Sequence, residues 1–321
     1  MKSINIFLIL LFSVSCSTGI ESSRKQNNYD LKADVDLFLS TSDSDIEVKT
    51  LKRLKDQKVS HTAVKNLLRQ RARPIEGKRG LLTGLKFNTQ GKEYSYAVYH
   101  PEKGNKPLPL VIVLHGMGGS GDNTATKWAK RLNNEFIVVC PSYPMGAWWS
   151  RPAEDMVLDL LDHTRAQYNV DDNRIFLAGL SNGAIGVYTI GMFYPDRFAG
   201  LIPIAGSITP RFMNFLINLR NTPIYMIQGA HDPIFPIQLS RRVNKILSDM
   251  RYPVVYREHD KKGMAHGGHF LPENEIPDLL EWIKKQKRSL NPSRVRMTRE
   301  NNHLGAINWA RLNKGKNLAS L

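Results

Sequence analysis

The chain has 321 residues, of which 41% are hydrophobic, so it is long enough to bury one substantial core as a single catalytic domain with appendages. Its formal net charge of +16 would suit a nucleic-acid-binding protein, but residues 49–80 and 284–321 each carry +9, which leaves −2 for the remainder. Neither zinc-ligand spacing nor an RNA-binding signature accompanies these charges, which argues against sequence-specific nucleic-acid binding.

The N-terminus has the composition of an export signal. Met1-Lys2-Ser3 precedes an apolar run from Ile4 to Val14, far shorter than the roughly 20 residues of a membrane-spanning helix. Cys16 stands where a bacterial lipoprotein signal places the cysteine that becomes acylated. We therefore expect residues 1–16 to be a lipoprotein signal peptide and the protein to be anchored in the bacterial cell envelope. An ordinary cleaved signal, with a periplasmic or secreted product, is the alternative.

The next segments are polar and then basic. Residues 17–45 are rich in Ser, Asp and Asn, which predicts a flexible tether. In the basic segment 46–80, apolar residues recur at helical spacing as far as Pro74, which predicts one or two amphipathic helices. Attraction of this segment and of the basic C-terminal flank to anionic lipid headgroups would suit an exported, acylated protein. Solvated helix faces are the alternative.

The pattern then changes to that of a catalytic domain, expected at residues 81–288. Period-two alternation on either side of residues 88–93 predicts an antiparallel hairpin. Uniformly apolar runs separated by polar helical stretches follow, which is typical of a parallel sheet covered on both faces. The runs are Leu110–Leu114, Phe136–Cys140, Ile175–Leu177, Leu201–Ile204, Ile224–Ile227 and Val254–Tyr256. The predicted fold class is α/β: a mostly parallel, doubly wound sheet with an N-terminal antiparallel hairpin.

The end of the chain is basic. The last predicted helix spans Glu275–Lys287, and residues 289–321 form a basic tail with two candidate short strands, at 293–298 and 306–309. Cys140 has no partner once Cys16 is removed or acylated, so packing and not a disulfide must stabilise the fold.

A Gly-x-Ser-x-Gly string, Gly179-Leu180-Ser181-Asn182-Gly183, is the first motif that carries chemistry. The string alone is weak evidence. Its setting, between an apolar strand at 174–178 and an apolar helix at 184–194, is that of a nucleophile elbow, where small residues let the chain turn sharply and lift the serine hydroxyl above the sheet. Ser181 is therefore the predicted nucleophile.

A serine that transfers acyl groups needs an anion hole, with one N–H after the nucleophile and one from the loop after an earlier strand. The loop His115-Gly116-Met117-Gly118-Gly119 follows such a strand, so the N–H groups of Met117 and Asn182 are the predicted donors. These glycines would also suit a phosphate-binding loop, but neither a dinucleotide-binding nor a Walker pattern is present. His115 is interpreted as a brace of the loop.

The acid and the base should follow in the order Ser, acid, His. Asp232, in Gln228-Gly229-Ala230-His231-Asp232-Pro233 after an apolar run, is the predicted acid, with Asp260 in reserve. Two histidines of one glycine-rich loop, His266 and His269, compete for the role of base. His269 is favoured because it abuts the last helix and directly follows a glycine. The other would line the pocket or be structural.

These stretches resemble the polyhydroxybutyrate depolymerase and feruloyl-esterase-like branch of the α/β-hydrolase superfamily, near the phospholipase/carboxylesterase family. The matching stretches, within roughly residues 85–288, are Pro109–Ser120, Tyr168–Ile175, Gly179–Gly183 and Gln228–Pro233. The resemblance implies the serine, acid and histidine roles given above, ester substrates and no cofactor. Two departures, Ala184 in place of a second glycine and the lack of paired cysteines, affect the expected substrate more than the reaction.

The predicted function is hydrolysis of small or polymeric carboxylic esters. Histidine deprotonates Ser181, the alkoxide attacks a carbonyl, two N–H groups bind the oxyanion, and water resolves the acyl-enzyme. Neither a cofactor nor a metal is expected. Trp148-Trp149 resembles a tryptophan-containing loop of the same branch, and either lines an acyl or aryl pocket or packs in the core. A serine peptidase, an acyltransferase and a catalytically silent envelope-anchored binding protein are the alternatives.

Overall fold

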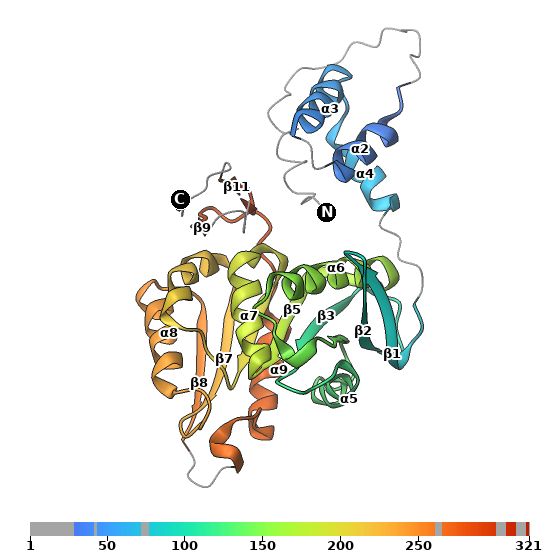
Figure 1. The fold of residues 1–321 in the computed structure, drawn as a ribbon. Coiled ribbons are helices and arrows are strands. Elements are labelled where there is room, and N and C mark those ends of the chain that lie inside the picture. The colour runs from blue at the N-terminus through green and yellow to red at the C-terminus, as the bar shows by residue number, and fades with distance from the viewer. Residues whose placement is uncertain are drawn as a thin grey trace. The chain divides into compact units, whose positions relative to one another are not determined.

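The computed structural model describes residues 29–41, 44–71, 77–260, 265–299, 306–312 and 319–320 (Figure 1). The chain divides between Arg73 and Pro74 into two compact units. The predicted signal peptide at residues 1–16, with Cys16, and the first part of the predicted tether lie outside the described residues. None of the described helices is long and apolar enough to cross a membrane.

The N-terminal unit consists, where it is described, of the helices α2 (Leu31–Ser40), α3 (Ser44–Asp56) and α4 (His61–Arg71). Helix α2 corrects the prediction of a flexible tether over residues 17–45. Its apolar face packs with the other two helices in a core of its own, formed by Val35, Phe38, Leu54, Val64 and Leu68. The Asp30 side chain accepts a hydrogen bond from the Ala33 N–H (3.0 Å) and so caps the start of α2. Within the predicted basic segment 46–80, α3 and α4 are the helices expected.

The second unit is built on an eight-stranded sheet of order β1-β2-β4-β3-β5-β6-β7-β8. The strands are β1 (Gly80–Thr89), β2 (Lys92–His100), β3 (Leu108–Leu114), β4 (Ile137–Pro141), β5 (Val170–Leu180), β6 (Gly200–Ile204), β7 (Ile224–Gly229) and β8 (Val254–His259). Strand β2 pairs antiparallel with β1 and β4, whereas β3 to β8 run parallel. The predicted fold class, a mostly parallel sheet with an antiparallel N-terminal hairpin, is confirmed.

In the described part of this unit, the α-helices that flank the sheet are α5 (Gly121–Arg131), α6 (Arg151–Gln167), α7 (Asn182–Phe193), α8 (Ile237–Asp249) and α9 (Ile276–Lys285). Shorter 3₁₀ helices are η1 (Pro144–Gly146), η2 (Pro195–Arg197), η3 (Pro210–Asn221), η4 (Ala265–Gly268) and η5 (Glu273–Glu275). The last predicted helix, at 275–287, is therefore present as η5 followed directly by α9.

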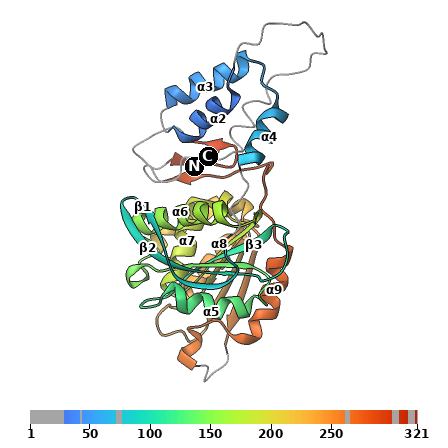
Figure 2. The same ribbon diagram turned by 90° about the vertical axis from the view of Figure 1, so that its right-hand side faces the viewer.

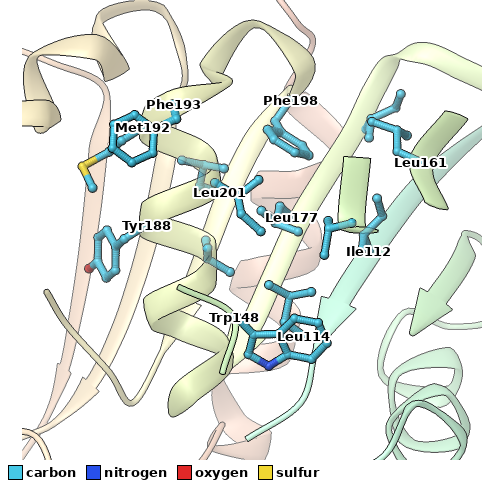
Figure 3. Close-up of a cluster of buried hydrophobic side chains, with 14 of the residues drawn as sticks. Ile112, Leu114, Trp148, Leu161, Leu177, Tyr188, Met192, Phe193, Phe198 and Leu201 are labelled. Carbon is cyan, nitrogen blue, oxygen red and sulfur yellow. The ribbon is translucent and has the colours of Figure 1, made fainter. Parts of the chain in front are cut away.

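The inner strands β3, β4, β6 and β7 are buried on both faces, and alternate side chains of each strand point to opposite sides. Ile112 and Leu114 of β3 belong to a core shared with α6, α7 and α8, part of which Figure 3 shows. Val111 and Val113 belong to a second core, shared with α5 and α9. Figure 2 shows α6 and α7 on one side of the sheet and α5 on the other. Burial of both faces explains why the strands read as uniformly apolar runs.

The basic C-terminal tail packs on the second unit where it is described. Its short strands are β9 (Thr298–Arg299), β10 (Ala306–Ile307), β11 (Ala310–Arg311) and β12 (Ala319–Ser320), of which β9 and β10 fall within or next to the two candidate strands. Met297 and Ile307 join the core that contains β3, α6 and α7. The buried Asn218 amide donates to the carbonyl of Thr298 (2.9 Å) and accepts from its N–H (2.7 Å). The described part of the tail that contains Met297, Thr298 and Ile307 is therefore packed into the core of this unit.

Candidate active site

Ser181 lies at the turn between β5 and α7, where the sequence predicts a nucleophile elbow. Its backbone has φ 58° and ψ −119°, a conformation that a residue with a side chain rarely adopts. The Ser181 N–H donates to the carbonyl of Ile204 in β6 (2.9 Å), which fixes the turn to the sheet. Strained backbone that is held by its surroundings is concentrated at functional sites. Here it presents the serine at the N-terminus of α7.

The glycines of the motif are needed because the turn leaves no room for a Cβ. A Cβ at Gly183 would overlap the carbonyl oxygen of Leu114 at the end of β3, and one at Gly179 would overlap the backbone of Gly183. The loop after β3 also approaches the serine itself. A Cβ built on Gly116 would lie 3.4 Å from Cβ and 3.9 Å from Oγ of Ser181. The loop predicted to form the anion hole is thus beside the serine.

His115 braces this loop. Its Nδ1 is 2.7 Å from the Gly116 carbonyl and its Nε2 is 3.1 Å from the Tyr143 N–H, so a neutral ring that donates through Nδ1 and accepts through Nε2 satisfies both partners. Burial lowers the pKa of His115, with a partly opposing effect of the Gly116 carbonyl, which favours that neutral form. The indole N–H of Trp148 donates to the His115 carbonyl (2.7 Å). These contacts agree with the bracing role inferred from the sequence.

The two adjacent tryptophans have different environments. Trp148 is fully buried, and its ring centroid lies 5.0 Å from that of His115 and 5.6 Å from that of Tyr143. Trp149 is 49% exposed. Of the two roles considered for this pair, packing in the core therefore applies to Trp148. Trp149 is half exposed at the surface.

The two predicted anion-hole residues come from different loops: Met117 from the loop after β3, and Asn182 from the position directly after Ser181. Met117 directly follows Gly116, and its side chain points outward, with 66% of the residue exposed. Asn182 is the first residue of α7, where backbone N–H groups have no partner within the helix. Its side-chain amide donates to the Met145 carbonyl (3.1 Å), which ties the helix start to η1.

Asp232 lies in the loop after β7, and its side chain is fully buried. Its Oδ1 accepts hydrogen bonds from the backbone N–H groups of Ile234 (2.8 Å) and Phe235 (3.0 Å). Its Oδ2 accepts from the Gln228 side-chain amide (3.0 Å) and lies 2.8 Å from His269 Nδ1. Hydrogen-bond partners on both oxygens of this buried carboxylate fix the direction of each oxygen.

His269 reaches Asp232 because its loop packs directly on the loop that carries the acid. A Cβ on Gly267 would overlap the carbonyl of His231, and one on Gly268 would lie 2.7 Å from Cα of Gly229. Both glycines also have positive φ, at 63° and 89°. The His269 ring lies parallel to that of Phe235, with 6.0 Å between the centroids. Because Nδ1 is directed at the carboxylate, Nε2 is the ring nitrogen that Asp232 does not engage.

The two reserve candidates have other surroundings. His266 is exposed, and its backbone has a φ of 51°. Its carbonyl oxygen accepts a hydrogen bond from the backbone N–H of His269 (3.0 Å). The Asp260 carboxyl is 77% exposed and lies 2.9 Å from Nε2 of His231. The structure thus brings Asp232 and His269 together, and it places neither His266 nor Asp260 in that pair.

The loop that carries His269 is anchored where it enters α9. Glu275 is buried, accepts a hydrogen bond from the Tyr225 hydroxyl and lies 3.2 Å from Nε of Arg257. His259 Nε2, at the end of β8, is also 3.2 Å from this carboxylate. Both ends of the loop therefore meet at one buried acidic group.

Sequence reasoning missed three polar side chains of this region: Gln228, Ser240 and Glu275. Gln228 stood in the stretch that carries the predicted acid, four residues before Asp232, and Glu275 stood at the start of the last predicted helix, but neither was given a role. The hydrogen-bond partners of Gln228 lie on separate elements. For metal binding, the described part of the chain contains no group of three or more His, Cys, Asp or Glu side chains with suitable geometry.

A mostly parallel sheet with an antiparallel N-terminal hairpin, and a strained serine turn between β5 and α7, place the chain in the α/β-hydrolase class of fold. Within this class, residues 151–287 match the model of the Phospholipase/Carboxylesterase family. The resemblance inferred from the sequence, to α/β-hydrolases near this family, is confirmed.

Two curated relatives and one solved structure illustrate the similarity. A bifunctional acetylxylan esterase/xylanase of Neocallimastix patriciarum is 27% identical over 46% of this chain and 23% of its own length. A poly(3-hydroxyalkanoate) depolymerase of Paucimonas lemoignei is 31% identical over 31% of this chain and 28% of its own. The chain thus spans 23% and 28% of these relatives. The crystal structure of a thermostable esterase, 27% identical, aligns with a TM-score of 0.55 over 65% of this chain and 63% of that one.

Proposed function

We propose that this protein hydrolyses carboxylic esters through an acyl-enzyme on Ser181, with His269 as the base and Asp232 as the acid that orients it. The observation that carries the proposal is the 2.8 Å hydrogen bond between His269 Nδ1 and the buried Asp232 carboxylate. This pair lies at the edge of the sheet where the strained Ser181 turn also lies. The names of the two relatives and of the solved esterase support an ester as the substrate.

The proposed mechanism follows from the direction of the histidine. Because Nδ1–H donates to Asp232, Nε2 is unprotonated and accepts the hydroxyl proton of Ser181 as Oγ attacks the ester carbonyl. The N–H groups of Met117 and Asn182 then stabilise the oxyanion of the tetrahedral intermediate. The protonated imidazole gives its proton to the leaving alcohol. A water, deprotonated by His269, finally attacks the acyl-enzyme and releases the acid and Ser181.

We expect Ser181→Ala to lower kcat for p-nitrophenyl acetate by about 10⁴-fold or more, because no other group can form the acyl-enzyme. The measurement is release of p-nitrophenol by the purified protein, with thermal unfolding as the check that the variant is folded. Hydrolysis that persists at the wild-type rate in Ser181→Ala would overturn the assignment of the nucleophile. Activity on peptide amides but not on esters would favour the peptidase alternative.

We also propose that the protein is a cell-envelope lipoprotein acylated on Cys16, held at the membrane surface with help from the basic residues of α3 and α4. The support is the sequence pattern of residues 1–16 and the several positive charges of the helical unit. Expression in a bacterium fed an alkyne-tagged fatty acid should label the wild-type protein and leave Cys16→Ser unlabelled. An unlabelled wild-type protein in the soluble periplasmic fraction would contradict the proposal.

A further inference from the structure

Gln228 is a buried side chain of the sheet that donates a hydrogen bond to the proposed acid. It lies near the end of β7 with 1% of its surface exposed. A buried amide has two donors and one acceptor oxygen to satisfy, and it is costly wherever they are left unpaired. Its Nε2 donates to Oδ2 of Asp232 (3.0 Å) and is 3.4 Å from the Gly229 carbonyl, while its Oε1 accepts from the Ser240 hydroxyl (3.2 Å).

These partners permit only one orientation of the amide. The Asp232 carboxylate and the Gly229 carbonyl both accept hydrogen bonds, so they require the nitrogen of the amide on their side. The oxygen then faces Ser240 of α8, whose hydroxyl is a donor and is itself buried, at 1% exposure. Helix α8 is thereby connected through Gln228 to the acid.

Gln228 donates to Oδ2 of Asp232, the same oxygen that His269 contacts. Oδ1 of Asp232 is already held by two backbone N–H groups of its own loop. Oδ2 has Gln228 and His269 as its partners, at 3.0 Å and 2.8 Å. Without Gln228, the position of Oδ2 would depend on the histidine that it is meant to orient. Hydrogen bonds to a charged acceptor are stronger and more directional than neutral ones.

We propose that Gln228 is a positioning residue for catalysis: its amide, oriented by Ser240, holds Oδ2 of Asp232 toward His269. The inference rests on the proposed function of this site. It assigns Gln228 no contact with substrate, so its loss should affect turnover and not substrate affinity. It should also alter how strongly the carboxylate stabilises the protonated imidazole.

Gln228→Met keeps the length of the side chain and removes its hydrogen bonds. We expect kcat for p-nitrophenyl acetate to fall about 10-fold to 100-fold with KM unchanged, because small misplacements of reacting groups are costly. With one donor fewer, more of the carboxylate charge acts on His269, so the acidic limb of kcat/KM should move to higher pH by about half a unit or more. Ser240→Ala, a smaller change, should move both quantities less and in the same direction.

Other ionisable groups around this loop can also affect the acidic limb of kcat/KM. These are Asp232, the His231–Asp260 pair, His266, and the His259–Glu275 pair. Because none of them is altered in Gln228→Met, the comparison with wild type isolates the amide. Asn218→Leu is the matched control: it removes a buried amide with three hydrogen bonds, to Met192 and Thr298, on η3. It should lower Tm and leave kcat and the acidic limb unchanged.

The outcomes separate this inference from the proposed function. A wild-type protein that does not hydrolyse the ester would overturn the proposed function and this inference with it. An active wild type with unchanged kcat and acidic limb in Gln228→Met would overturn the inference alone. Equal losses of kcat in Gln228→Met and Asn218→Leu would also overturn it, since general destabilisation would then be the cause. A shifted acidic limb in Gln228→Met and Ser240→Ala, absent in the control, is the result expected.

Discussion

His269→Ala should lower kcat for p-nitrophenyl acetate by about 10⁴-fold or more, because it removes the group that accepts the Ser181 proton. His266→Ala should retain the activity of the wild type. The reason lies in the two environments: the His269 ring is 2.8 Å from a fully buried carboxylate, whereas His266 is exposed and meets the base only through its backbone. The measurement is kcat and KM for both variants alongside Tm.

The pair of variants is a matched comparison because both histidines lie in the same loop and differ in sequence by three positions. A loss of activity in His266→Ala that equals the loss in His269→Ala, with Tm unchanged in both, would mean that the wrong histidine has been assigned. A loss in His266→Ala that is accompanied by a lower Tm would instead mark damage to the loop, whose φ of 51° at this position an alanine tolerates poorly.

Asp232→Asn should lower kcat by about 10⁴-fold while leaving the fold intact. An asparagine that keeps its oxygen where Ile234 and Phe235 donate must place its amide nitrogen at the position of Oδ2. That nitrogen would face two donors, the Gln228 amide and the Nδ1–H of His269. The histidine is then driven to the tautomer with the proton on Nε2, which cannot accept the proton of Ser181.

Asp260→Asn is the control for this substitution. Its carboxyl is mostly exposed and paired with His231, so activity should stay close to that of the wild type. If Asp260→Asn abolished turnover and Asp232→Asn did not, the order of acid and reserve derived from the sequence and the loop geometry would be reversed.

The sheet and the serine turn could be predicted because their signals are local. The hairpin follows from alternation around a two-residue loop in which Gln90 and Gly91 both have positive φ, as the tight hairpin turns require. The elbow follows from three small or turn-forming residues between an apolar strand and an apolar helix. In both cases the residues that decide the structure are neighbours in the sequence.

Of the three helices of the N-terminal unit, α2 was not predicted, because it is stabilised by packing against the other two. Leu31, Val35 and Phe38 recur at the spacing of one helix face, but in a stretch otherwise rich in Ser, Asp and Asn this pattern was outweighed by composition. Val35 and Phe38 are buried in a cluster that includes residues of α3 and α4, such as Leu54 and Val64. Tertiary packing therefore stabilises α2, and the polar composition of the segment does not reveal this.

The sequence favoured His269 over His266 as the base but did not decide between them. Both follow small residues in one loop, and spacing alone left the base open between them. The decision depends on how that loop packs on the residues after β7, which requires Gly267 and Gly268 against His231 and Gly229. The same is true of Gln228, whose role emerges only when Ser240 of α8 and Asp232 are seen on either side of its amide.

The most direct test of the central claim is labelling with a fluorophosphonate probe, which reacts only with an activated serine. We expect one adduct per molecule by intact mass, located by peptide mapping on the fragment that contains Ser181, and no adduct in Ser181→Ala. Labelling should be greatly slowed in His269→Ala and unaltered in His266→Ala. An unlabelled wild-type protein, or an adduct that persists in Ser181→Ala, would contradict the assignment of Ser181 as the nucleophile.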